Sequence, residues 1–230
     1  MAIQEHPLKL AITLPWWQVI TILVGFPILY FANNFTPWSK GLFVKRDHGY
    51  YIPVFCSILL LHWASVALVF IFVSQAGGGL PDIGLQLSAR KAAVMIGIFL
   101  VVATALVFLR QTRPANYPSR LPADMPPLLP VNLGERIFWM FASVSAGICE
   151  ELVYRGFGLC ALRGNGVPTW LAVVLCSLAF VLIHGLWGLR KFWVYFIVGL
   201  LYSALFLWIQ DLTPGIWIHT LWDMGFMFAG

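Results

Sequence analysis

Long apolar segments recur along the whole chain and leave little room for any other architecture. A helix that crosses the hydrocarbon core of a bilayer needs about 20 predominantly apolar residues, and the chain falls into segments of about that length. We therefore expect an all-α fold, a polytopic membrane helix bundle of about seven transmembrane helices. The expected helices are Leu14–Ala32, Tyr51–Val73, Ala92–Leu109, Ile137–Leu162, Trp170–Trp187, Phe192–Ile209 and Gly215–Ala229.

Composition agrees with a membrane protein. The 230 residues are 60% hydrophobic and 10% charged, whereas soluble domains carry about 25% charged residues. The basic residues fall mostly between the apolar segments, which is typical of topology signals and not of nucleic-acid binding. We expect a multi-pass integral protein of a bacterial inner (plasma) membrane, in contact with the lipid bilayer. The cysteines lie in apolar segments without metal-binding spacing and are expected to be buried free thiols: Cys56, Cys149, Cys160 and Cys176.

A proline-rich segment divides the chain. Residues 110–130 contain six prolines and cannot form a regular helix. They separate an N-terminal part, residues 1–130 with transmembrane helices and the linker, from a C-terminal core, residues 131–230. Loops on one side of the expected bundle carry eight lysines and arginines against four on the other. The positive-inside rule then predicts an outside N-terminus and a cytoplasmic C-terminus.

Ionisable residues interrupt the apolar segments of the C-terminal core. They are Glu150, Glu151, Arg155, His184, His219 and Asp223. Each such residue near a bilayer centre costs about 2.5–3.5 kcal/mol. Because buried charges in membranes face the bundle interior and pair there, we expect these six side chains to meet in one polar intramembrane cavity.

Helical spacing suggests how these residues divide the chemistry. Residues four apart share a helix face, so Arg155 can hold Glu151 ionised and Asp223 can fix the tautomer of His219. Glu150 points about 100° away from Glu151 round the helix and has no partner four residues on. A desolvated carboxylate of this kind suits a general base for water. The two histidines can orient that water or donate to a developing oxyanion.

The ionisable residues fall into three patterns: Glu150-Glu151-x-x-x-Arg155, Phe180-x-x-x-His184 and His219-x-x-x-Asp223. Together, the three patterns resemble those of the CPBP (ABI) intramembrane protease family, which includes the type II CAAX prenyl proteases. The resemblance covers about residues 135–230 and implies an α-helical membrane fold with a polar cavity open to water. It also implies that a glutamate-activated water cleaves a peptide near the membrane. Asp223 departs from the Asn of the prenyl-protease members, and an ionised Asp cannot donate to an oxyanion.

We therefore expect an intramembrane endopeptidase of glutamic or metal-dependent type that acts on a membrane-associated protein or peptide. No cofactor is firmly implied, although Glu150, His184 and His219 form a conceivable zinc set. An inactive membrane scaffold or self-immunity protein of the same fold is the alternative. A proton-coupled transporter is disfavoured, because the polar residues lie only in the second half. Histidines outside the patterns are interpreted as bystanders: His6, His48 and His62.

The depth of the site favours one placement of the glutamate helix. If its membrane span began at Ile137, Glu150 would lie about 20 Å from the cytoplasmic side, much deeper than His184. A span nearer Ala142–Leu162 brings the two residues to about 12 and 9 Å. We predict that second register.

Overall fold

The computed structural model describes residues 11–86, 129–184 and 189–226, together with separate positions between 88 and 105. Within these residues every regular element is helical, which confirms the all-α fold. Four helices in this part of the chain are long and apolar enough to cross a membrane. The predicted count of seven transmembrane helices is not confirmed. The four are Trp16–Asn33, His48–Gln75, Leu133–Gly164 and Lys191–Ile209.

The N-terminal part forms two long helices joined by a short one. A single π-helical turn interrupts the first long helix just before Pro27, a residue that has no N–H to donate. Thr36 caps the short helix, which the sequence analysis did not predict, by accepting from the backbone N–H of Ser39 at 3.2 Å. The elements are α1 (Trp16–Ile20), η1 (Thr21–Gly25), α2 (Phe26–Asn33), α3 (Pro37–Phe43), η2 (His48–Tyr50), α4 (Tyr51–Gln75) and η3 (Leu80–Ile83).

The helix that carries the glutamates is longer than predicted. It runs without a break through α6 (Leu133–Glu150), η4 (Glu151–Gly158) and α7 (Leu159–Gly164). It starts at Leu133 because Asn132 caps it: the Asn132 side chain accepts from the backbone N–H of Glu135 at 2.9 Å. The start predicted at Ile137 is therefore wrong by four residues. The narrower span Ala142–Leu162 lies inside the helix and stays a prediction.

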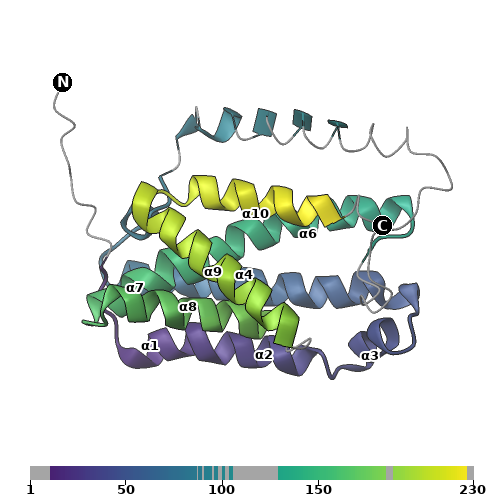
Figure 1. Ribbon diagram of the computed structural model, residues 1–230, viewed down its shortest axis with the longest axis horizontal. Helices are drawn as coiled ribbons and strands as arrows, with labels where there is room; N and C mark the ends of the chain where they lie inside the picture. The colour runs from purple at the N-terminus through teal and green to yellow at the C-terminus, as the bar shows by residue number, and fades with distance from the viewer. Residues whose placement is uncertain are drawn as a thin grey trace.

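The last three helices are α8 (Thr169–Ile183), α9 (Leu189–Ile209) and α10 (Thr213–Phe226). Helix α8 packs on α9 and α2, and α10 packs on α6 (Figure 1). Helix α8 ends at Ile183, short of the predicted Trp187, and residues 185–188 lie outside the described residues. The predicted helix Ala92–Leu109 and the proline-rich linker also lie partly or wholly outside them. The division of the chain at residue 130 stays a prediction.

Short α8 removes the depth conflict that the sequence raised. The α7–α8 turn places the end of one helix beside the start of the other. Glu150 precedes Gly164, the last residue of α7, by 14 residues, which is about 20 Å along the helix. The 15 residues of α8 carry the chain about 22 Å in the opposite direction. Glu150 and His184 therefore lie at the same level inside the bundle.

Buried apolar side chains from both parts of the chain form one core around η4. Its members come from α1, α2 and α4 as well as from η4, α7 and α8. Close helix contact depends on Gly147, because a Cβ there would collide with Thr220 of α10. Three of the predicted free thiols are buried, whereas Cys56 is exposed, so the prediction of a buried thiol is wrong at that position.

Candidate active site

The structure brings all six predicted site residues together in the middle of the bundle. The two glutamates flank the junction between α6 and η4 and point to different neighbours. Eight residues of π-helix follow that junction, and such π-helical insertions are common at functional sites. Helix α8 supplies His184 at its end, and α10 supplies His219 and Asp223.

Glu150 is buried, with 4% of its surface exposed. Its Oε1 lies 3.0 Å from Nε2 of His62 on α4. Its Oε2 is buried and has no hydrogen-bond partner among the described residues. The atoms nearest to Oε2 from the predicted set are Nε2 of His184 at 3.9 Å and Nε2 of His219 at 3.7 Å. Glu150 was expected to lack a partner four residues on in its own helix, and its hydrogen-bond partner comes from α4 instead.

His184 is held in a single orientation at the end of α8. Its Nδ1 lies 2.9 Å from the carbonyl oxygen of Phe180, and since a carbonyl only accepts, Nδ1 carries the proton. The ring stacks on Tyr195 at 4.2 Å between centroids. In the neutral ring Nε2 is then an acceptor, and it faces Oε2 of Glu150. Phe180 was expected to pack beside the site, and its backbone also fixes this tautomer.

Glu151 and Arg155 form the predicted pair and extend it to two further helices. Nη1 of Arg155 donates to Oε1 of Glu151 at 3.0 Å, and Nη2 donates to the carbonyl oxygen of Gly199 on α9 at 3.4 Å. The guanidinium also lies over the ring of Phe180, 4.4 Å from its centroid. Arg155 is completely buried, so this pair joins η4, α8 and α9 away from water.

Glu151 also determines the orientation of His219. Nδ1 of His219 lies 3.0 Å from Oε1 of Glu151, and because this carboxylate is paired with Arg155 it accepts the proton. Asp223 was expected to fix this tautomer, but its Oδ2 is 3.7 Å from Nε2 of His219, too far for a hydrogen bond. That expectation is wrong. Asp223 and His184 are the partly exposed members, with side chains 26% and 21% exposed, so they form the open edge of the site.

His62 is the residue that the sequence analysis missed. Described as a bystander, it is buried and makes the direct contact to Glu150. The available signal was its position: it is the one strongly polar titratable side chain inside the apolar segment Tyr51–Val73. An ionisable residue within a membrane segment is by default a candidate for function.

The zinc set that the sequence suggests, Glu150, His184 and His219, stays a prediction. No group of three or more His, Cys, Asp or Glu side chains in the described part of the chain is arranged to hold a metal ion. The chemistry derived below therefore uses no step through a metal.

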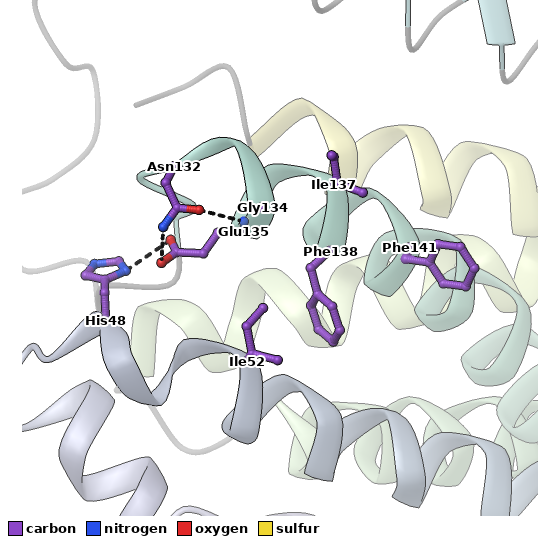
Figure 2. Close-up of a pocket in the computed structure, with 8 residues that line it drawn as sticks. All are labelled: His48, Ile52, Asn132, Gly134, Glu135, Ile137, Phe138 and Phe141. Atoms are coloured by element: carbon purple, nitrogen blue, oxygen red, sulfur yellow. Dashed lines mark hydrogen bonds and ion pairs between the residues drawn. The ribbon is translucent and has the colours of Figure 1, made fainter.

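A separate pocket lies at the other end of α6. It encloses about 440 Å³ between the starts of α4 and α6, and Figure 2 shows an ion pair at its rim, where Nδ1 of His48 faces Oε2 of Glu135 at 3.2 Å. Glu135 precedes Glu150 by 15 residues, or about 22 Å of helix, so this pocket is separate from the site of Glu150 and Glu151. Its lining residues are His48, Ile52, Asn132, Gly134, Glu135, Ile137, Phe138 and Phe141.

Comparison with known families supports the resemblance seen in the sequence. Residues 132–225 match a family model described as type II CAAX prenyl endopeptidase, Rce1-like. This match confirms the relation to the CPBP and CAAX proteases for the C-terminal part of the chain, and it spans all six predicted site residues. His62 lies outside it. No curated protein and no solved structure matches the chain.

Proposed function

We propose that this chain, with a C-terminal part similar to type II CAAX prenyl endopeptidases, is an intramembrane endopeptidase that hydrolyses a peptide bond by glutamate-activated water. The substrate is a membrane-associated protein or peptide. The observation that carries the proposal is that Oε2 of Glu150 is buried, has no hydrogen-bond partner among the described residues, and faces two imidazole nitrogens.

Water is the nucleophile that this arrangement suits. Distances of 3.9 and 3.7 Å from Oε2 to the two Nε2 atoms are too long for direct hydrogen bonds and suited to a bridging water. The water donates one hydrogen bond to Oε2 of Glu150 and the other to the acceptor Nε2 of His184, which leaves a lone pair for attack on the peptide carbonyl. As the C–O bond forms, one proton of the water passes to Glu150 and the other stays on the attacking oxygen. Glu150 then passes the proton to the leaving amine.

His219 is placed to stabilise the tetrahedral intermediate. Its ring is held by Glu151 at Nδ1 and faces the open edge with Nε2. In its doubly protonated state it donates from Nε2 to the developing oxyanion. In its ionised form Asp223 cannot donate to that oxygen, but that form can stabilise the imidazolium from 3.7 Å. Because this chain has Asp223 where the prenyl-protease members have Asn, His219 then donates to the oxyanion without help from that position.

The proposed setting is the inner membrane of a bacterium, with several passes. The four long apolar helices and the family match indicate an integral membrane protein. The α7–α8 turn carries Arg163, on the side that the charge count assigns to the outside. The open edge of the site then faces the cytoplasmic half of the bilayer.

The test is cleavage of a membrane-tethered peptide by the purified protein in liposomes. We expect Glu150→Gln to abolish cleavage, since it keeps the shape and removes the base. Glu135→Gln is the matched control, because it changes a carboxylate on the same helix that also pairs with a histidine; it should cleave at the wild-type rate. Equal cleavage by Glu150→Gln and wild type would refute the mechanism. Cleavage by neither would favour the scaffold.

Two further arms of the same assay define the chemistry and the substrate. Incubation with a chelator should leave the rate unchanged, because the proposed mechanism uses no metal. Loss of activity that zinc restores would refute the metal-free mechanism. Peptides with and without a prenylated C-terminus should be compared at equal concentration. Preference for the prenylated form would extend the family likeness to the substrate.

A further inference from the structure

The carboxylate of Glu150 is held from outside the region that matches the family. His62 is contributed by α4, 88 residues earlier in the chain, and its Nε2 lies 3.0 Å from Oε1 of Glu150. We propose that His62 is a positioning residue, which holds Oε1 so that Oε2 faces the water and the substrate. The inference rests on the proposed function, because it assigns a task to the partner of the catalytic base.

The hydrogen bonds define which protons His62 carries. An ionised carboxylate only accepts, so Nε2 of His62 is the donor to Glu150. Its Nδ1 is buried and finds no partner among the described residues. A proton on Nδ1 would be left unsatisfied in that place, at a cost of about 1–3 kcal/mol. His62 therefore donates to Glu150 from Nε2, and this contact fixes the orientation of its ring.

The surroundings of His62 prevent its ring from turning away. The ring packs against Tyr30 of α2, with centroids 5.2 Å apart, and both residues are buried. The next residue, Trp63, donates from Nε1 to Oγ of Ser145 on α6 at 3.3 Å. This contact ties α4 to α6 five residues before Glu150. A base held this firmly keeps the orientation that proton transfer needs.

Other groups face Glu150 but none in the described structure takes over this contact. His184 and His219 approach Oε2. Arg155 pairs with Glu151, and Asp223 faces His219. The titratable and charged groups around it are His62 of α4, Tyr30 of α2, His184 of α8, His219 and Asp223 of α10, Tyr195 and Tyr202 of α9, and Cys149, Glu151, Tyr154 and Arg155 of its own helix.

Three substitutions separate positioning from packing. The amide nitrogen of Gln extends about as far from the backbone as Nε2 of His, so His62→Gln keeps the donor. The shorter His62→Asn keeps the polarity without reaching Glu150, and His62→Leu removes the donor altogether. The matched control is His48→Leu, which breaks the other histidine–glutamate pair between these two segments at 3.2 Å.

We expect His62→Asn and His62→Leu to lower kcat about ten- to a hundredfold, the equivalent of one hydrogen bond to a charged group, with KM within about twofold. His62→Gln should restore kcat to within about fivefold of wild type, and His48→Leu should leave it unchanged. If His62→Leu does not fold, the comparison of Asn with Gln decides.

The pH profile gives a readout that packing would not change. A hydrogen bond to the ionised form of a carboxylate favours that form, so its loss should move the acidic limb of kcat to higher pH in Asn and Leu but not in Gln. Wild-type kcat in Asn and Leu would overturn the inference alone, as would equal loss in all three variants with an unmoved acidic limb. Full activity in Glu150→Gln would overturn the proposed function, and the inference with it.

Discussion

Arg155→Met tests whether the buried ion pair at η4 stabilises the bundle. The substitution keeps an unbranched side chain of similar length and removes the charge. It deletes the 3.0 Å hydrogen bond to Glu151, the 3.4 Å contact to the carbonyl of Gly199, and the cation–π contact to Phe180 at 4.4 Å. Within the described part of the chain, Glu151 then keeps His219 as its one hydrogen-bond partner, and it stays buried.

The expected loss follows from what stays behind. Removing one partner of a buried ion pair costs about 3–5 kcal/mol, because the remaining charge is uncompensated. The double variant Arg155→Met, Glu151→Gln removes both charges. It should therefore be less destabilised than the sum of the two single variants, with a coupling of about 1–3 kcal/mol.

The measurement is the free energy of unfolding in mixed micelles, with denaturing detergent as the variable. Lys91→Met is the control, since it breaks the Lys91–Asp211 pair, in which the lysine side chain is 40% exposed; about 0–1 kcal/mol is expected there. Additive effects at Arg155 and Glu151, or a loss no larger than that of Lys91→Met, would refute the reasoning.

Two further predictions concern helix contact and the oxyanion. Gly147→Ala should destabilise the protein by about 1–3 kcal/mol, because the new methyl collides with Thr220. Gly225→Ala should be neutral, because no atom of the described residues lies within 4 Å of a Cβ added there. Equal unfolding free energies for the two variants would contradict the close approach of α6 and α10. Asp223→Asn should retain or raise kcat because the amide adds an oxyanion donor, while Asp223→Leu should lower it; a kcat in Asp223→Asn as low as in Asp223→Leu would show that the negative charge is essential.

Local spacing predicted the parts of the site that lie within one helix. Glu151 and Arg155 pair because residues four apart share a face, and this holds in π-helix as well. The need of buried charges for partners also predicted that α8 and α10 would bring their histidines to the glutamates. Both arguments use chemistry that is visible in a short stretch of sequence.

The missed features depend on contacts between distant segments or on helix ends. Nothing in the spacing of His62 says that α4 lies beside α6, so its bond to Glu150 could not be derived. Hydropathy placed the start of α6 at Ile137, whereas Asn132 and Glu135 form a cap that begins the helix at Leu133. The end of α8 at Ile183 was missed for a similar reason, because the apolar residues continue beyond the helix.

The length of α8 determines how far from the membrane surface a substrate bond would have to lie to reach Glu150. If the α7–α8 turn marks one face of a hydrocarbon core of about 30 Å, the 15 residues of α8 end about 8 Å short of the other face. An extended peptide rises about 3.3 Å per residue, so the bond that the proposed mechanism presents to Glu150 would lie about two to three residues inside the interface. Cleavage position would then be counted from the membrane surface and would follow bilayer thickness rather than the sequence around the bond.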